Sequence, residues 1–201
     1  MSHLERWEER FSAPGYLFGT EPNAFLRSQA DLLQPGMAAL AVADGDGRNG
    51  VWLAQRGLDV HAVDFSPTAL AKARALARGR GVTIRTELAD LVHWKWPAEA
   101  YDAVVAIFVQ FTMPDERSRM FAGMKRALRR GGVLLLEGYR TKQLEYGTGG
   151  PRNAEQLYTR DLLEAEFGDL ADLSIREYDA ELDEGERHAG MSALIDLVGR
   201  K

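Results

Sequence analysis

The chain contains no cysteine among its 201 residues. This absence excludes disulfide bonds, thiolate zinc sites and cysteine nucleophiles. The four histidines, His3, His61, His93 and His188, are scattered along the chain and have no acidic partners at ligand spacing. Protein metal sites bring several such side chains together, often through spacings such as His-x-x-x-His. We therefore expect no metal centre.

Long apolar runs and an excess of positive charge are also missing. The longest apolar stretches, near residues 104–111 and 133–136, have the length of a strand, and the charged amino terminus lacks the apolar core of a signal peptide. Lys and Arg number 25 against 30 Asp and Glu, a net charge of -5. Surfaces that bind nucleic acid or anionic lipid are usually basic. We therefore expect a cytoplasmic protein that binds neither nucleic acid nor membranes.

The length of the chain fits one domain, which we expect to span residues 1–201. Short apolar runs alternate with longer helical patterns, as they do in a mostly parallel sheet covered by helices. The expected parallel strands are residues 37–43, 59–65, 82–88, 102–109 and 132–139. The expected helices in this part of the chain are residues 4–11, 23–33, 50–56, 67–78 and 115–129.

The pattern changes after the fifth expected strand. A glycine-rich loop at residues 142–151 precedes a helix expected over residues 153–167. Two further strands, 173–182 and 192–198, are joined by a link of hairpin length, so they should be antiparallel. The sequence thus predicts an α/β fold with a mostly parallel seven-stranded sheet and a terminal antiparallel hairpin. We expect residues 1–33 to form a helical lid segment.

The turn after the first strand is rich in glycine and acidic residues. Gly45, Gly47 and Gly50 satisfy the pattern G-x-G-x-x-G, and Asp64 ends the next strand 19 positions after Gly45. Glycines let the backbone approach a ligand closely, and the following helix directs its amides toward that ligand. A carboxylate at the position of Asp64 is placed to accept hydrogen bonds from both hydroxyls of a ribose. The pattern predicts a nucleoside-binding site.

Two kinds of cofactor fit this glycine pattern. Read alone, it is a dinucleotide fingerprint, so an oxidoreductase that uses NAD or NADP is one alternative. A pyrophosphate would lie against Asp44 and Asp46, whose charge repels it, whereas a sulfonium and an ammonium group would be attracted. The chain also lacks a Tyr-x-x-x-Lys pair and the length for a separate substrate domain. Charge therefore favours S-adenosylmethionine.

The order of these features resembles a class I S-adenosylmethionine-dependent methyltransferase along nearly the whole chain. Residues 101–104 read Tyr-Asp-Ala-Val where that family has (Phe/Tyr)-Asp-x-Val, and residues 128–132 match the glycine turn before its fifth strand. Segments 16–22, 145–151 and 182–190 resemble a bacterial branch near the tellurite-resistance and thiopurine methyltransferases. The resemblance implies a three-layer Rossmann-like sandwich, S-adenosyl-L-methionine as cofactor and a small-molecule acceptor.

The resemblance also implies a set of cofactor-binding residues. Asp90 would lie near the adenine amine with Phe65 stacked nearby, while the strand end at residues 107–108 would present backbone beneath the methionine moiety. The expected set is Asp44, Gly45, Asp46, Gly47, Asn49, Asp64, Phe65, Ser66, Asp90, Leu91, Ile107 and Phe108.

One departure from the family pattern concerns its first motif, (Asp/Glu)-x-Gly-x-Gly-x-Gly. This chain has Ala41 in place of the acid and Ala43 in place of the first glycine. The missing acid commonly supports the loop and the methionine end of the cofactor, and Asp44 is a candidate to replace part of its role. A catalytically weakened S-adenosylmethionine-binding protein is therefore a third possibility.

The acceptor side is predicted from topology. In such a sheet, the loop after the fifth strand and the terminal hairpin should both lie at the carboxyl edge, which makes Tyr146 and His188 the candidate catalytic residues. The residues expected to form the lid and line the acceptor pocket are Trp7, Tyr16, Phe18, Tyr139 and Arg140. A thiol, a metalloid oxyanion and a small heterocycle all remain open as acceptors. The sequence is compatible with both a monomer and a homodimer.

Overall fold

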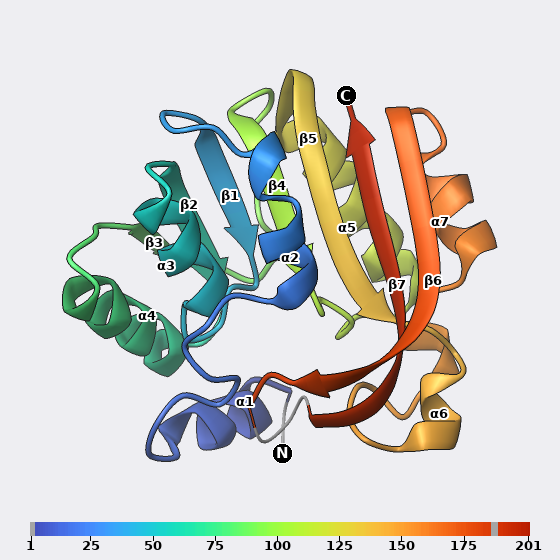
Figure 1. Cartoon of the computed structure of the whole chain (residues 1–201), viewed down its shortest axis with the longest axis horizontal. Helices are drawn as coiled ribbons and strands as arrows, with labels where there is room; N and C mark the ends of the chain where they lie inside the picture. Colours follow the sequence, from blue (N-terminus) through green and yellow to red (C-terminus); the bar gives the residue numbers. More distant parts are fainter. Residues whose placement is uncertain (1–2, 186–188) are drawn as a thin grey trace.

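The computed structural model describes residues 3–185 and 189–201, which form a seven-stranded sheet with helices on both faces (Figure 1). The strand order is β3-β2-β1-β4-β5-β7-β6. The strands are β1 (Ala38–Val42), β2 (Asp59–Asp64), β3 (Arg85–Leu88), β4 (Tyr101–Ile107), β5 (Leu128–Tyr139), β6 (Ala171–Asp183) and β7 (Ala189–Arg200). The predicted α/β fold with a mostly parallel seven-stranded sheet is confirmed.

The sheet extends from β1 in both directions: β2 and β3 follow on one side, and β4 and β5 follow on the other. β1 pairs in parallel with β2 on one side and with β4 on the other, whereas β7 runs antiparallel to both β5 and β6. Connections on the two sides of β1 therefore leave the sheet in opposite directions. Such a reversal opens a crevice at the carboxyl ends of the two central strands. The topology alone thus places a ligand site beyond the ends of β1 and β4.

Helices cover both faces of the sheet, and the sheet lies between the two largest parts of the core. α2 (Ala24–Ser28), α3 (Arg48–Gln55) and α4 (Pro67–Gly79) pack on one face. α5 (Pro114–Ala127) and α7 (Arg160–Phe167) pack on the other. Side chains of a strand alternate between faces, so both faces of a central strand must be apolar to be covered in this way.

The shortest central strand shows this division directly. In β1, Leu40 and Val42 belong to the part of the core under α5 and α7, while Ala39 and Ala41 belong to the part under α3 and α4. All four are at most 2% exposed. Small residues on the α3 side let that layer approach the sheet closely, which brings the start of α3 near the end of β1.

Some helix boundaries differ from those predicted. The segment expected as one helix over residues 23–33 divides into α2 and a short 3-10 turn, Ala30–Leu32. The helix expected from residue 153 begins only at Arg160, because the Thr159 side chain accepts a hydrogen bond from the Leu162 amide and caps it there. The glycine-rich loop contains a single helical turn, α6 (Gln143–Tyr146).

The terminal hairpin is longer than predicted. β6 and β7 pair from Ala171–Arg200 at one end to Asp183–Ala189 at the other, and beyond β5 the two strands continue together past the main sheet (Figure 1). This extension reaches the N-terminal segment, since a Cβ atom added to Gly185 would lie 2.7 Å from the carbonyl carbon of Phe18. The N-terminal segment and the end of β6 therefore meet at the carboxyl edge of the sheet.

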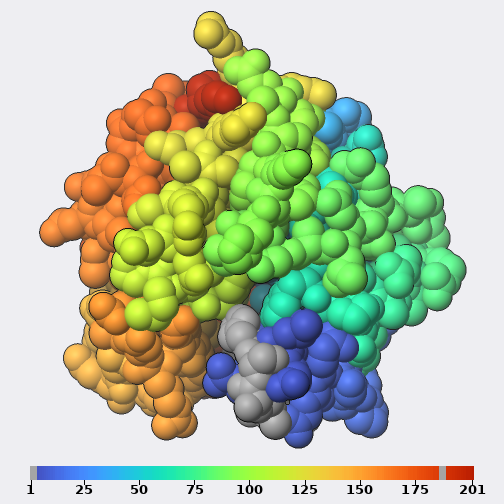
Figure 2. Space-filling model, turned by 180° about the vertical axis from the view of Figure 1, so that it is seen from behind, coloured from blue at the N-terminus to red at the C-terminus, as the bar shows by residue number. Residues whose placement is uncertain are grey.

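The first helix, α1 (His3–Ser12), lies outside the two helical layers, at the end of the molecule below the carboxyl edge. It contacts α4 there. In the view from behind, the N-terminal residues and the residues that follow β5 occupy opposite sides of this lower end (Figure 2). Among the residues that the structure describes, no helix has both the length and the apolar character required to cross a membrane.

The connection between β3 and β4 contains no helix and packs through tryptophans instead. The rings of Trp94 and Trp96 meet edge to face at 5.0 Å, and Trp96 donates a hydrogen bond of 3.2 Å to the carbonyl of Leu91. The Trp96 ring lies directly on α5 at Gly123, where an added Cβ would come within 2.5 Å of it. The glycine in α5 is therefore a packing requirement, in spite of its low helix propensity.

We expect Gly123→Ala to lower the free energy of unfolding by about 1–3 kcal/mol, because the methyl group overpacks the Trp96 contact. Gly79→Ala is the matched control, since an added Cβ at Gly79 meets nothing within 4 Å. In the control, helix propensity alone should act and stabilise the protein by about 0.5–1 kcal/mol. Chemical denaturation measures both. Equal effects of the two substitutions would contradict the packing described here.

Candidate functional site

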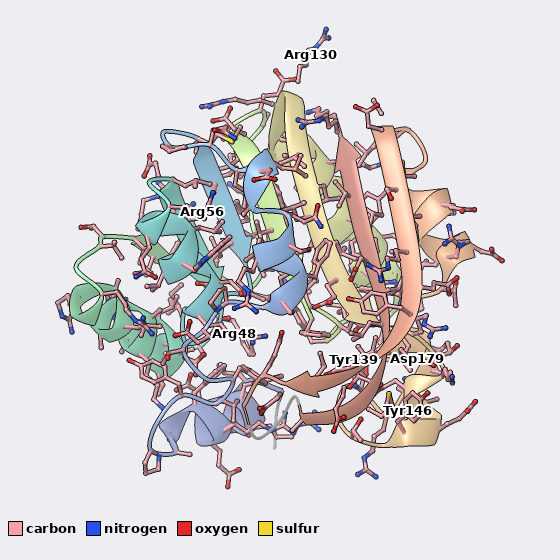
Figure 3. The ribbon with its side chains drawn as sticks, in the orientation of Figure 1. Arg48, Arg56, Arg130, Tyr139, Tyr146 and Asp179 are labelled. Carbon is pink, nitrogen blue, oxygen red and sulfur yellow. The ribbon has the colours of Figure 1, made fainter. Side chains whose placement is uncertain are left out.

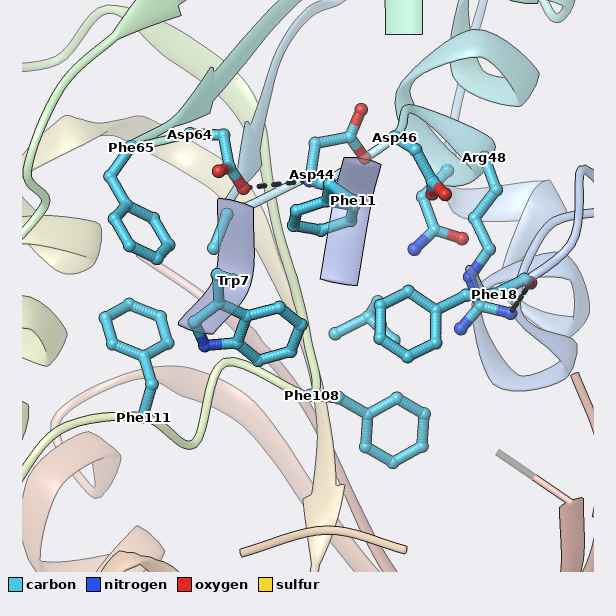
Figure 4. Close-up of a pocket in the computed structure, with 14 residues that line it drawn as sticks. Trp7, Phe11, Phe18, Asp44, Asp46, Arg48, Asp64, Phe65, Phe108 and Phe111 are labelled. Atoms are coloured by element: carbon cyan, nitrogen blue, oxygen red, sulfur yellow. Dashed lines mark hydrogen bonds between the residues drawn. The ribbon is translucent and has the colours of Figure 1, made fainter. Parts of the chain in front are cut away.

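A cavity lies beyond the carboxyl ends of β1, β2 and β4, at the place that the topology predicts (Figure 4). It has about 640 Å³ of empty space and is open on one side. Its lining residues are Trp7, Phe11, Phe18, Ala43, Asp44, Gly45, Asp46, Arg48, Asn49, Asp64, Phe65, Ile107, Phe108 and Phe111. Acidic side chains come from the strand ends and aromatic side chains from the segments around them, so the cavity has one charged wall and one flat apolar wall.

The glycine loop forms the charged wall because its backbone comes unusually close to its neighbours. Gly45 and Gly47 have φ angles of +59° and +96°, a region that L side chains rarely adopt. A Cβ on Gly47 would lie 2.6 Å from the Cβ of Ala73 in α4, and a Cβ on Gly45 would lie 3.3 Å from the ring of Phe11. Glycine is required at both positions for the loop to fit between α4 and α1.

Backbone strain is concentrated at the same place. Ala43 and Phe108, which end β1 and β4, have φ angles of +49° and +55°. For residues with a side chain this left-handed conformation costs on the order of 1–2 kcal/mol each. Ala43 occupies the position where the sequence pattern of related proteins has glycine, so the substitution keeps the conformation and adds strain. Both strained residues line the cavity.

Asp64, at the end of β2, binds the glycine loop. Its two carboxylate oxygens accept hydrogen bonds of 2.9 Å from the amides of Gly45 and Ser66. Each oxygen retains a second lone pair, so the carboxylate can still accept from a ligand. Burial, the largest cause, raises the pKa of Asp64 to about 6, although the two amides act against that rise.

Asp44 and Asp46 have oxygens without partners. Asp44 Oδ1 accepts from the Gly50 amide at 3.0 Å and Asp46 Oδ2 from the Leu17 amide at 2.7 Å. The second oxygen of each is buried and has no hydrogen-bond partner among the residues that the structure describes. Burial raises the pKa of both, that of Asp44 to about 8, and repulsion from Asp64 and Asp46 adds to the rise for Asp44. Such groups attract a cationic ligand that donates hydrogen bonds.

The N-terminal segment closes the cavity and is fastened to its rim. Asp46 accepts the Leu17 amide, and Glu8 accepts hydrogen bonds from the hydroxyls of Ser66 and Thr68. Lys72 of α4 donates to the carbonyls that follow α1, at 2.6 and 2.7 Å. α1 thereby holds two aromatic rings over the opening, Trp7 and Phe11, with their centroids 5.5 Å apart.

A buried polar network joins the glycine loop to the terminal hairpin. Arg48, beside the loop, forms an ion pair with Glu184 at 2.8 Å. Asn23, which is fully buried, donates its backbone amide to Asn49 and its side-chain amide to Glu137 of β5. These bonds connect the segment before α2, the glycine loop and the hairpin, so the cavity wall depends on contacts between residues far apart in the sequence.

Two further cavities border the first. One contains Asp90 and Leu91 and shares Phe65 and Phe111 with it, the two rings lying 6.4 Å apart. The other has about 1350 Å³ of empty space, partly open to solvent, and contains Tyr139, whose ring stacks on Phe108 at 4.6 Å. The aromatic residues of the first cavity thus also form the boundary walls of its neighbours.

The expected site residues are brought together in part. The main cavity includes Trp7, Phe18, Asp44, Gly45, Asp46, Asn49, Asp64, Phe65, Ile107 and Phe108. Gly47 and Ser66 support its wall from behind, through the close contact with α4 and the hydrogen bond to Asp64. Tyr16 instead packs against the core under α3 and α4.

Two of the expected acceptor-pocket residues lie elsewhere. The hydroxyl of Tyr146 donates to Asp179 of β6 at 3.0 Å, and Arg140 pairs with the same carboxylate and with the carbonyl of Leu194 (Figure 3). Neither residue lines the cavities described above. Both side chains are instead held against β6 and β7, which corrects the expectation that they line the acceptor pocket. His188 lies outside the described residues.

Four lining residues were not in the predicted set: Phe11, Ala43, Arg48 and Phe111. Ala43 entered the sequence analysis only as a departure from the family motif. Phe11 follows Trp7 by four positions, which places both on one helix face, and this spacing was an available signal. Arg48 lies within the glycine loop itself. Phe111 follows the end of β4 by a few residues, and only the fold shows that the chain returns there toward Phe65.

Comparison with known protein families finds a match for the part of the chain that contains the glycine loop and the central strands. The model of a methyltransferase-domain family matches residues 39–132. A curated relative, the methyltransferase GfsG of Streptomyces halstedii, is 34% identical over 104 residues, which is 50% of this chain and 37% of that protein. The chain spans little more than a third of the length of the curated relatives that it matches.

Solved structures extend the similarity of the fold to most of the chain. A Methanosarcina mazei protein described as an S-adenosylmethionine-dependent methyltransferase superposes with a TM-score of 0.72 at 17% identity, covering 90% of this chain and 98% of that one. TehB from Haemophilus influenzae superposes with a TM-score of 0.71 at 18% identity, covering 98% and 66%. This chain therefore has the Rossmann-like fold of the class I methyltransferases, and its glycine loop and central strands match the methyltransferase-domain family.

Proposed function

We propose that this protein is an S-adenosylmethionine-dependent methyltransferase that acts on a small-molecule acceptor. The observation that carries the proposal is the pair of buried, unpartnered carboxylate oxygens on Asp44 and Asp46 at the switch point of a methyltransferase fold. The match of residues 39–132 to a methyltransferase-domain family supports it. The fold similarity to TehB supports, more narrowly, a relationship to the tellurite-resistance branch.

The residues present fit this cofactor better than a dinucleotide. Asp44 and Asp46 offer open acceptor oxygens to an ammonium group. A nearby cation favours the ionised form of both carboxylates, whereas a pyrophosphate would raise their pKa further and would be repelled by any charge they carry. Asp64 has lone pairs left for ribose hydroxyls. Phe65 and the neighbouring cavity that contains Asp90 offer a flat surface and an acceptor for adenine. These are the residues that would hold the cofactor.

When bound, S-adenosylmethionine supplies an electrophilic methyl group, which the acceptor's lone pair takes as the carbon–sulfur bond breaks. The part of the chain in this reaction is orientation and exclusion of water. Trp7 and Phe11 cover the opening, and the hydrogen bonds of Glu8 and Asp46 hold them there. The strained backbone at Phe108 presents the end of β4 to the cavity. We include this N-terminal segment in the proposal as a lid.

The described residues offer no obvious general base to the acceptor. Burial raises the pKa of Tyr139, so its hydroxyl stays protonated at neutral pH. Tyr146 is bonded to Asp179 away from the cavity. An acceptor whose nucleophilic atom is already ionised or carries a free lone pair fits this surface, since it needs no proton removed. A thiolate, a metalloid oxyanion and a heterocyclic nitrogen all meet that condition.

Cofactor choice tests the proposal first. We expect S-adenosylhomocysteine to raise the melting temperature, and NAD, NADP and ATP to raise it much less, because the aspartates repel phosphate. The protein should then convert S-adenosylmethionine to S-adenosylhomocysteine with at least one acceptor of a thiol, metalloid and heterocycle panel. Stabilisation by NAD alone would support an oxidoreductase instead. Cofactor binding without product from any acceptor would support a binding protein.

The ribose role of Asp64 gives a second prediction. Asp64→Asn should weaken S-adenosylhomocysteine binding by about 1–3 kcal/mol, the range for hydrogen bonds to a charged acceptor. Asp59→Asn is the matched control, because Asp59 lies exposed at the other end of the same strand. Calorimetry should find its affinity unchanged. Equal affinities in the two variants would place the ribose away from Asp64.

The raised pKa of Asp44 predicts a pH dependence of stability. Its unfolded pKa is about 3.9, so the folded protein, with a pKa of about 8, binds the proton more tightly than the unfolded chain. This contribution to stability is present in full below pH 4 and is lost as pH rises through 8. Asp64 and Asp196, whose pKa values are raised to about 6, act in the same direction. The ligand-free protein should therefore lose stability between pH 5 and 8.5.

Asp44→Asn should remove part of that loss. At pH 8 the variant should melt above the parent by roughly 3–6 °C, equivalent to about 1–2 kcal/mol, while binding S-adenosylhomocysteine more weakly. Asp31→Asn, at an exposed position, is the control and should change neither property. A parent-like slope of melting temperature against pH in Asp44→Asn would show that another group causes the dependence.

A further inference from the structure

We infer that the acceptor is a small organic anion with a flat apolar body, held in the cavity beside the cofactor site by Arg6, Arg10 and Arg152. This inference rests on the proposed methyltransferase function and specifies its substrate class. The cavity lies on the far side of Trp7, Phe18, Phe108 and Phe111, the four residues that it shares with the cofactor cavity.

The charge of this second cavity is opposite to that of the first. The cofactor cavity is lined by three aspartates and Arg48, whereas the second cavity is lined by three arginines and no acidic residue. Arg6 and Arg10 come from α1, one helical turn apart, and Arg152 comes from the loop after α6. Segments separated by about 140 positions in the sequence thus place positive charge around one opening.

Among the residues that the structure describes, these three arginines have no acidic partners, unlike many other arginines in the chain. Arg48, Arg80, Arg129, Arg140, Arg160 and Arg200 all form ion pairs. Within residues 3–185 and 189–201, no carboxylate lies within ion-pair distance of Arg6, Arg10 or Arg152. Arg10 instead stacks on Trp7, with 4.9 Å from its guanidinium carbon to the ring centroid. Unpaired guanidinium groups at a cavity recognise carboxylates and other oxyanions.

The floor of the cavity defines the rest of the ligand. Phe108 and Tyr139 stack there at 4.6 Å. The glycine-rich loop after β5 approaches so closely that a Cβ on Gly150 would lie 2.7 Å from the Tyr139 ring. Of the two glutamines that line the cavity, Gln110 is occupied by the backbone of Tyr139 and Gln156. The floor therefore offers flat apolar surface, and the polar recognition comes from the arginines at the rim.

The test compares ligands of one shape and different charge. Binding of benzoate, benzamide and benzylamine is measured by calorimetry, both with the protein saturated with S-adenosylhomocysteine and with the protein alone. We expect benzoate to bind about tenfold more tightly than benzamide, and benzylamine most weakly. Raising the salt concentration should weaken benzoate and leave benzamide unchanged. Equal binding of benzoate and benzamide, or no binding of either at millimolar concentration, would overturn the inference.

Variants identify the residues responsible. The double variant Arg6→Gln/Arg152→Gln should weaken benzoate binding by about tenfold and change benzamide binding by less than about twofold. Arg130→Gln is the matched control, since Arg130 lies at the opposite end of the molecule from Tyr139 (Figure 3). Loss of the benzoate preference in the control as well would contradict a local site.

The two proposals fail in different ways. Absence of S-adenosylhomocysteine binding would refute the proposed function, and the benzoate preference of the protein alone would still decide the charge of the second cavity. Normal S-adenosylhomocysteine binding without a preference for benzoate would refute only the anionic acceptor.

Discussion

The burial of three carboxylates at the ends of β1 and β2 is the constraint on which the rest of the site depends. Asp44, Asp46 and Asp64 line one cavity, and burial raises the pKa of each, with repulsion from neighbouring aspartates adding to the rise for Asp44 and Asp64. The backbone amides of Gly45, Ser66 and Gly50 donate hydrogen bonds to these carboxylates and stabilise them in part. Because those amides do not use every oxygen, a residual attraction for cations remains. The glycine loop, the strained residues beside it and the N-terminal segment all surround these unpartnered carboxylate oxygens.

The lid and the loop are parts of one structure because a single aspartate serves both. Asp46 accepts the Leu17 amide with one oxygen and faces the cavity with the other. The hairpin is connected to the same place through Glu184 and Arg48. A ligand that binds Asp46 therefore acts on a group that also holds the covering segment. The N-terminal segment and the charged wall are thus linked through this one side chain.

The parts of this arrangement that depend on local patterns could be predicted from the sequence. Alternating strands and helices, the turn at residues 43–50 and the acid that ends β2 each follow from spacing and residue type, and the structure shows the predicted fold. The parts that depend on the path of loops could not. Tyr146 was expected at the acceptor site because it follows β5, but α6 turns it toward Asp179. The arginine rim was missed because Arg6 and Arg152 meet only in the folded chain.

The division of charge between the two cavities follows from where each side chain is anchored. The aspartates stand at the ends of central strands or in the tight loop that follows β1, positions that the sheet and α4 hold rigidly. The arginines stand on α1 and on the loop after α6, both outside the sheet. A rigid wall suits a ligand that every catalytic cycle must bind in the same way, and peripheral segments suit recognition that differs between enzymes. Trp7, Phe18, Phe108 and Phe111 line both cavities, so the opposite charges lie on the two sides of one set of apolar rings, which lowers the screening that water would give between them.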